Sequence, residues 1–332
     1  MRTLRHNARL AWLALNLAFC GAPAGAAPIC QGRDLSESPD VTPDFAKHAD
    51  ELVNGEGLLW RIKKPGLARS YLFGTIHSTN AEAVALAREA ATFIKGANAV
   101  ATELGGVLDA QQKIDMGAAM LKAALSPAED TIAGAFDARD VERIDAFVRE
   151  RGYAPQMAHH LKLWFLAAAT SFPACESEGA WAGLPEVDQL IAETAKALGV
   201  RVVGLETVDE QLSSLSSVSP QIAAALLGAA ARLPSLNDDS YVTLLTLYRQ
   251  KRPARAIAIL DALPGLTPSE RAAQTEFLRA LLVGRNEAMM VRAAPLLADG
   301  GAFIAVGALH LPGKGGLIER VRAAGYALTK VW

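Results

Sequence analysis

Two strand-like segments, one near each end of the chain, finish with the same Gly-x-x-His pattern. The first is YLFGTIH (residues 71–77) and the second is AFIAVGALH (residues 302–310). Their apolar, β-prone residues predict strands, and glycine allows backbone angles that permit a sharp turn. His77 and His310 are therefore expected at the carboxyl ends of strands, where open α/β sheets place their ligand sites. Two halves of one sheet facing each other would bring the two histidines together.

Composition indicates a globular protein without a nucleic-acid surface. The chain has 332 residues, of which 51% are hydrophobic and 20% charged, so it can bury a large core. Its formal net charge is −2, and no long run of one sign interrupts the sequence. A basic patch of the kind that binds nucleic acid is therefore not expected.

The first 26 residues have the three parts of a signal peptide. Arg2, Arg5 and Arg9 form a basic start, residues 10–20 are apolar, and Ala24 and Ala26 form an A-x-A cleavage site. The alternative is a buried N-terminal helix. Because the apolar run is too short to span a bilayer comfortably, we expect a periplasmic or secreted protein without a stable membrane span.

Cysteine usage agrees with export. Cys20 would leave with the signal peptide, and Cys30 and Cys175 would remain as an even pair. An oxidising compartment permits a disulfide between them, although two free thiols are the alternative.

The order of patterns predicts an α/β (α+β) fold. Residues 27–57 are expected to form an extended arm, and residues 58–62 and 71–75 a hairpin. Further strands are expected at 99–102, 201–205, 303–306 and 326–332. Helical patterns dominate between them, roughly over 105–195 and 212–299, and include helices at 109–125, 137–151 and 156–171. The result is a central mixed sheet built from two Gly-x-x-His βαβ-type units with a large helical insertion between them.

Four predicted strands end in a residue that could ligate a metal or transfer protons. These residues are His77, Glu103, Glu206 and His310. Imidazole and carboxylate together suit a divalent transition metal such as Mn, Co or Zn, and such an ion can lower the pKa of bound water to about 7. For each histidine alone, a satisfied turn or core residue is the alternative.

The acidic and basic candidates each have a simpler explanation. Glu103 could form a salt bridge or cap a helix. Glu206 could simply precede a helix, whose N-terminus favours acidic residues. Asp188 could orient a ligand histidine or be an exposed acid early in a helix. Arg285, followed by Asn286, could bind a substrate carboxylate or pair with a nearby acid.

Several segments together resemble the TraB/GumN family. They are LFGTIH (72–77), GLET (204–207) with Gln211, Arg285-Asn286, and VGALHLPG (306–313). The wider group includes the Tiki proteases and is related to the erythromycin esterase-like and ChaN-like fold. The resemblance runs from about residue 58 to 332, and four motifs in the same order make it specific.

The resemblance implies metal-dependent hydrolysis of peptides. His77 and His310 match the motif histidines and Glu103 the acid after the first helix, so these three would hold the metal. Glu103, Glu206 and Arg285 would serve catalysis, while Asp188 and Asn286 would orient the ligands. Because some relatives bind or sequester peptides, the alternative is a peptide-binding protein that uses the same cleft without turnover. The expected partner is a peptide or small molecule.

Overall fold

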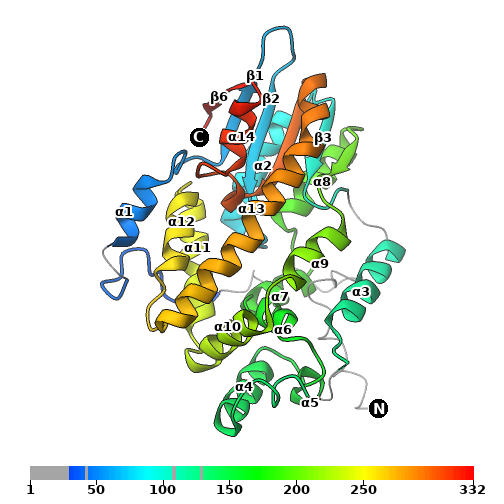
Figure 1. Ribbon diagram of the computed structural model, residues 1–332. Coiled ribbons are helices and arrows are strands. Elements are labelled where there is room, and N and C mark those ends of the chain that lie inside the picture. Colours follow the sequence, from blue (N-terminus) through cyan, green and yellow to red (C-terminus); the bar gives the residue numbers. More distant parts are fainter. Residues whose placement is uncertain (1–29, 42–43, 107–109, 128–129) are drawn as a thin grey trace.

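A six-stranded mixed sheet occupies one half of the protein in the computed structural model, which describes residues 30–41, 44–106, 110–127 and 130–332 (Figure 1). The strands are β1 (Leu59–Lys63), β2 (Ser70–Thr75), β3 (Ala99–Thr102), β4 (Val202–Gly204), β5 (Ala302–Gly307) and β6 (Ala327–Lys330). Their order is β4-β3-β5-β2-β1-β6. The first four run parallel, and β1 is antiparallel to both of its neighbours. The predicted α/β (α+β) fold with a mixed sheet is confirmed.

The two Gly-x-x-His units lie on adjacent strands. β2 pairs with β5 in parallel, with Gly74 opposite Val306 and Thr75 opposite Gly307. The predicted hairpin is also present, since β1 pairs with β2 in antiparallel fashion and Leu59 lies opposite Phe73. Segments more than two hundred residues apart in sequence therefore end at the same edge of the sheet.

Helices make up most of the described chain outside the sheet. They are α1 (Asp44–Glu51), α2 (Ala81–Ala91), α3 (Ala110–Ala124), α4 (Ala138–Glu150), α5 (Pro155–Ala158), α6 (Leu163–Ala169), α7 (Ala174–Trp181), α8 (Val187–Ala197), α9 (Val208–Ser216), α10 (Pro220–Arg232), α11 (Leu236–Arg249), α12 (Pro253–Asp261), α13 (Pro268–Asp299) and α14 (Leu317–Ala323), with 3₁₀ turns η1 (Thr92–Ile94) and η2 (Ala308–His310). No single helix in this part of the chain is long and apolar enough to cross a membrane.

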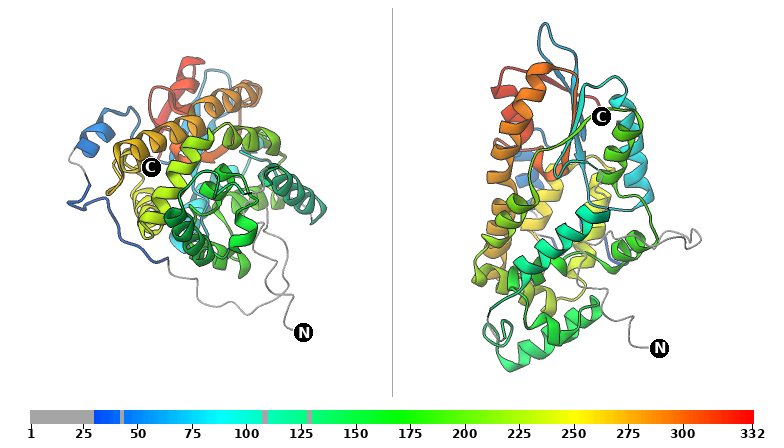
Figure 2. Two further views of the ribbon diagram at one scale, coloured as in Figure 1. Left: turned by 60° about the horizontal axis from the view of Figure 1, so that its bottom comes forward. Right: turned by 90° about the vertical axis from the view of Figure 1, so that its right-hand side faces the viewer.

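Helices cover both faces of the sheet, as the right-hand view of Figure 2 shows. The alternation of β5 decides which side chains face which layer, because successive residues of a strand point to opposite faces. Phe303 and Ala305 pack in the core formed with α2, α8 and α11. Ile304 and Val306 pack in the core formed with α13 and α14. The sheet is therefore buried on both sides, as parallel sheets usually are.

Helix α13 joins the sheet to the helical half of the molecule (Figure 1). It begins with a capping box in which Thr267 and Glu270 bond each other's backbone N–H, and Pro268 occupies its first turn. Its 32 residues correspond to a length of about 48 Å. Its C-terminal half packs on the sheet through Met289 and Leu297. Arg285 and Asn286 lie midway along it, beside the strand ends.

The helix predicted over 156–171 is wrong in one respect, because the structure breaks it into α5 and α6. The chain between them pairs with neighbouring segments instead of continuing the helix. The Ser126 N–H donates to the His160 carbonyl at 2.9 Å, and Lys162 N–H donates to the Ala124 carbonyl at 2.8 Å. The carbonyls of residues 159 and 160 and the N–H of Lys162 thus bond neighbouring segments, where a continuous helix would use them internally.

The N-terminal segment also differs from the extended arm predicted over 27–57. It contains α1, and Leu35 and Val41 are buried against α11 and α12. The predicted disulfide between Cys30 and Cys175 is present and links segments 145 residues apart. The expected signal peptide, residues 1–26, lies outside the described residues.

Candidate functional site

Each of the four parallel strands delivers one candidate side chain to the same edge of the sheet. His77 follows β2, Glu103 follows β3, Glu206 follows β4, and His310 closes the 3₁₀ turn after β5. The pairing of β3 and β4 continues past the strands, since the Glu206 N–H donates to the Glu103 carbonyl at 2.8 Å. The two carboxylates therefore leave the backbone side by side.

The glycines of both units serve close packing rather than a special backbone angle. Gly74 and Gly307 both lie outside the positive-φ region, so the prediction that they supply unusual angles is wrong. A Cβ on Gly74 would lie 2.8 Å from Leu311 Cδ1, and one on Gly307 would lie 3.1 Å from Glu103 Oε1. In each unit, the missing side chain makes room for a neighbouring segment.

Arg285 joins the two buried carboxylates. Its Nη2 donates to Glu103 Oε2 at 2.7 Å and to Glu206 Oε2 at 2.6 Å, while its Nε donates to Glu206 Oε1 at 2.9 Å. All three side chains are at most 10% exposed. Arg285 is therefore paired with nearby acids, which was the alternative to binding a substrate carboxylate. The salt bridge considered for Glu103 is also present.

Glu103 is held as an anion. Burial opposes its ionisation. The positive charges of His310 in its protonated form, of Arg285 and of His77, together with the Gly307 N–H, outweigh that effect and lower the pKa of Glu103 below its usual range. The Gly307 N–H donates to Glu103 Oε1 at 2.7 Å. Each carboxylate oxygen thus has one donor, and each retains a further lone pair.

His310 is a buried neutral imidazole. Its side chain is 4% exposed, and burial lowers the pKa of its ring to about 4, against the attraction of Glu103. The Asn286 amide nitrogen donates to the Gly315 carbonyl at 3.0 Å, so its Oδ1 is the acceptor for His310 Nδ1–H at 2.7 Å. The unprotonated nitrogen is then Nε2, which lies 3.9 Å from Glu103 Oε1.

His77 is the opposite case. Its side chain is 54% exposed, and its Nδ1 lies 3.1 Å from Asp188 Oδ2. The negative charge of Asp188 raises the pKa of His77 above its usual value. Asp188 therefore contacts the histidine, as the orienting role required, although it also lies in the first turn of α8.

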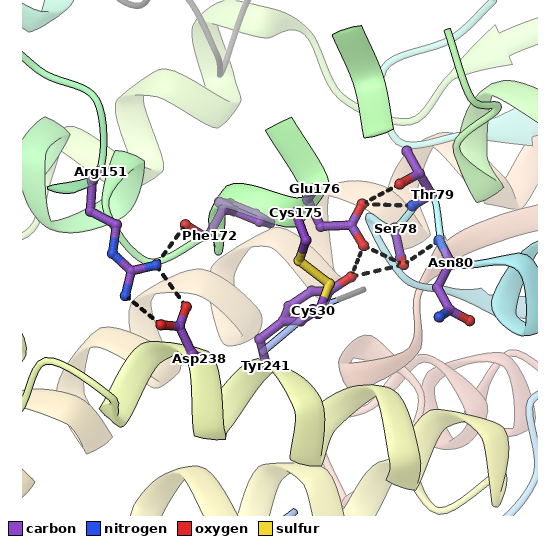
Figure 3. The surroundings of a disulfide bond; sticks show 10 residues. All are labelled: Cys30, Ser78, Thr79, Asn80, Arg151, Phe172, Cys175, Glu176, Asp238 and Tyr241. Atoms are coloured by element: carbon purple, nitrogen blue, oxygen red, sulfur yellow. Dashed lines mark hydrogen bonds and ion pairs between the residues drawn. A yellow bond between two sulfur atoms is a disulfide. The ribbon is translucent and has the colours of Figure 1, made fainter. Parts of the chain in front are cut away.

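A buried carboxylate anchors the loop that follows His77. Glu176 accepts hydrogen bonds from the Ser78 hydroxyl at 2.8 Å, from the Thr79 backbone N–H at 2.7 Å, and from the hydroxyl of Tyr241 (Figure 3). It is 2% exposed and adjoins Cys175 of the disulfide. The covalent link to the N-terminal segment thus lies one residue from the group that positions the His77 loop.

A cavity of about 380 Å³ opens at the strand ends. Its polar end includes Thr75, His77, Glu103, Arg285 and His310, and the remainder is lined mainly by apolar side chains of α10 to α13. The cavity therefore reaches from the sheet into the helical half.

Two residues of this site were not predicted from the sequence. The sequence signal of Glu176 is its position beside Cys175. Thr75 is 1% exposed, and its hydroxyl has no hydrogen-bond partner among the described residues. Nothing in the sequence marks that hydroxyl as unpaired.

The comparison with known families covers this whole arrangement. A sequence model described as the TraB/PrgY/gumN family matches residues 58–330. The chain belongs to the TraB/PrgY/gumN family. The match includes both Gly-x-x-His units, both strand-end glutamates and the Arg285-Asn286 pair of this TraB/PrgY/gumN protein. No curated protein matches the chain.

The donor types at this site, imidazole nitrogen and carboxylate oxygen, are ones that divalent cations accept. In the described residues, no three His, Cys, Asp or Glu side chains form a ready-made metal group. Each histidine nevertheless has its Nδ1 beside a side-chain oxygen, of Asp188 or Asn286, and among the described residues the Nε2 of each ring makes no hydrogen bond. Ligand histidines in metal sites are oriented in the same way. Two buried carboxylates share the single guanidinium of Arg285, so one negative charge is left to balance.

Proposed function

We propose that this protein is an exported hydrolase of amide bonds in peptides, in which His77, Glu103 and His310 hold a divalent transition metal. The observation that carries the proposal is the orientation of the two histidines around one buried anion at the polar end of one cavity. The disulfide and the predicted signal peptide support export. The proposal follows the Tiki-like activity that the sequence resemblance implies.

Each residue has a distinct task in this proposal. A bound divalent ion would supply an activated water and polarise the scissile carbonyl. Glu103 is already ionised, His310 already presents a free Nε2, and His77 would release its proton on binding the ion. Arg285 fixes the Glu103 carboxylate, and Glu206 in turn holds Arg285. The lone pairs that the Glu103 carboxylate keeps free are available to accept a proton from water.

The second candidate is a peptide-binding protein without turnover. This candidate is favoured because both Glu103 oxygens already accept a hydrogen bond, one from Arg285 and one from the Gly307 N–H. In this case the same cavity would hold the peptide, and the histidines would be polar contacts.

Metal content separates the two candidates. The exported, tag-free protein would be dialysed against Mn, Co or Zn and analysed for bound metal, beside His77→Ala, His310→Ala and the control His160→Ala, which alters an exposed histidine outside the site. The hydrolase predicts near-stoichiometric metal in wild type and control, and loss in both site variants. Uptake unaffected by the site substitutions, or no uptake together with no peptide cleavage, would reject it.

A further inference from the structure

The cavity has an apolar arm that leads away from the strand ends. Its wall is built by Leu226 and Ala230 of α10, Leu244 of α11, and Leu278 and Leu281 of α13. These side chains belong to helices that pack around one another in the helical half of the molecule (Figure 2). A ligand held at His77 and His310 therefore has an apolar space beside it.

The length of the arm can be read along α13. Gln274, Leu278, Leu281 and Arg285 all line the cavity, and their spacing of three or four residues places them on one stripe of the helix. From Gln274 to Arg285 the stripe spans eleven residues, which is about 16 Å at 1.5 Å per residue. The arm is accordingly long and bordered by one continuous helix.

Three polar side chains along the arm already donate to protein groups. Tyr248 donates to the Gly74 carbonyl at 3.0 Å, and Ser240 donates to the Leu236 carbonyl at 2.6 Å. The Asn237 amide donates to the Thr170 carbonyl at 2.9 Å. These donors are therefore engaged before any ligand enters.

This lining discriminates between two kinds of apolar ligand. An extended peptide of about five residues would fill the arm, since each residue spans about 3.3 Å. Its backbone N–H and C=O groups would be buried among leucine and alanine side chains, where unpaired polar groups are strongly disfavoured. A hydrocarbon chain carries no such groups and gains from every methylene that it buries.

We propose that the arm holds the hydrocarbon chain of an N-acylated peptide, with the acyl carbonyl beside His77, Glu103 and His310. An extended chain spans about 3.6 Å over three backbone bonds, which is about 1.2 Å per bond. The arm, about 16 Å long, therefore accommodates a hydrocarbon chain of roughly thirteen bonds. This inference rests on the proposed hydrolase. The reaction adds the oxygen of water to the acyl carbon, breaks the C–N bond and transfers a proton to the departing nitrogen. Its products are a fatty acid and a peptide with a free amine.

Binding is measured first, because it does not require turnover. Isothermal titration calorimetry would compare N-butanoyl, N-octanoyl, N-dodecanoyl and N-hexadecanoyl Ala-Gly below their micelle concentrations. We expect affinity to rise about threefold to fourfold per methylene as far as dodecanoyl, with no further gain for hexadecanoyl. A flat series, or a free penta-leucine peptide that binds as tightly as the dodecanoyl ligand, would overturn the proposal. Equal affinity for dodecanoic acid would reassign the arm to free fatty acids.

Substitutions in the wall locate the chain. Leu281→Trp should shorten the preferred chain by several methylenes, and Leu244→Trp, from the neighbouring helix α11, should do the same if the first variant folds poorly. Val283→Trp is the matched control, because Val283 is 47% exposed on the same helix and does not line the cavity. If both wall variants keep the wild-type chain-length profile, the arm is not the chain site.

Turnover separates this inference from the proposed function. With Mn, Co or Zn present, release of dodecanoate and Ala-Gly supports both. Chain-length-dependent binding without release retains the acyl-chain site and rejects the hydrolase. Cleavage of unacylated peptides with no dependence on chain length retains the hydrolase and rejects the acyl-chain site.

Discussion

The two Gly-x-x-His units share a sequence pattern and end on adjacent strands, yet their histidines have opposite properties. His77 is 54% exposed and has its pKa raised by Asp188, whereas His310 is 4% exposed and has its pKa lowered to about 4 by burial. Their partners differ as well, a carboxylate in one unit and the Asn286 amide in the other. The local motif therefore fixes where a histidine lies, and the surrounding helices decide its charge.

The supports of the two units differ in the same way. The His77 loop is anchored by Glu176, beside the disulfide, while the His310 turn is held by α13 through Asn286. Substitutions can therefore disturb one unit and spare the other. The largest effects are expected where a covalent link or a buried charge is removed.

Removal of the disulfide should destabilise the His77 side of the site. For Cys30→Ser combined with Cys175→Ser, the closed loop of 145 residues predicts a loss of about 4–5 kcal/mol in the free energy of unfolding, by the loop-entropy relation. Urea denaturation measures the loss, and reduction of the wild-type protein should reproduce it. In hydrogen exchange, residues 78–80 should lose more protection than residues 308–311. Equal loss in both turns would show that the disulfide does not act through Glu176.

Removal of the Arg285 guanidinium, which Glu103 and Glu206 share, should destabilise the His310 side of the site. Arg285→Met leaves Glu103 and Glu206 buried without their partner, and breaking a buried pair in this way costs about 3–5 kcal/mol. Arg279→Met on the same helix is the control. Its 62% exposed side chain pairs with Glu276 in solvent, so a far smaller change than in Arg285→Met is expected. Similar midpoints for both variants in thermal denaturation would contradict the role of Arg285.

A Cβ tests the close packing of each glycine. Gly74→Ala would place the new atom 2.8 Å from Leu311, which is fully buried, so about 1–3 kcal/mol of stability should be lost. Gly307→Ala meets Glu103 Oε1 at 3.1 Å and should lose less stability while displacing that carboxylate. In Gly307→Ala, metal binding or turnover should therefore fall by more than its loss of stability explains.

Gly284→Ala is the control for both glycine variants. It lies on α13 with nothing within 4 Å of the new Cβ, and alanine favours helix, so the variant should be neutral or slightly more stable. Losses of equal size in all three variants would show that the effect is not local packing.

Much of the fold could be predicted because strands and their ends leave short-range signals. The segment at 99–102 shows this, since four apolar or β-branched residues before Glu103 specify both the strand and the side chain at its end. The positions of His77 and His310 followed in the same way. Their different charges could not be predicted, because that of His77 depends on Asp188 of α8 and that of His310 on burial, and both are properties of tertiary packing.

Other features depend on contacts that sequence spacing does not reveal. The pairing of Arg285 with Glu103 joins residues 182 positions apart, and no local pattern selects an acid partner over solvent. The break between α5 and α6 arises from backbone bonds to residues 124–126. The apolar arm is similarly invisible, because leucines that line a cavity have the same helical spacing as leucines in a core.

The smallest expected change concerns the partner of His77. Asp188→Asn keeps the shape of the side chain and removes its charge, so the pKa of His77 should fall toward its usual value of about 6.5. Because Asp188 raises the folded-state pKa, its stabilisation is fully present below about pH 6.5 and is lost as the pH rises through the folded pKa. Water screens this half-exposed pair, so the difference in unfolding free energy should be about 1 kcal/mol or less.

Titration by nuclear magnetic resonance measures this change directly, with the ring of His310 as the internal control. The His77 signal should titrate at lower pH in Asp188→Asn, while the His310 signal keeps its position, because its charge is set by burial and not by Asp188. A parallel shift of both rings would mean that the two units share one electrostatic environment. An unchanged His77 would mean that solvent, not the carboxylate, sets its charge, and the contrast between the units would then reduce to exposure alone.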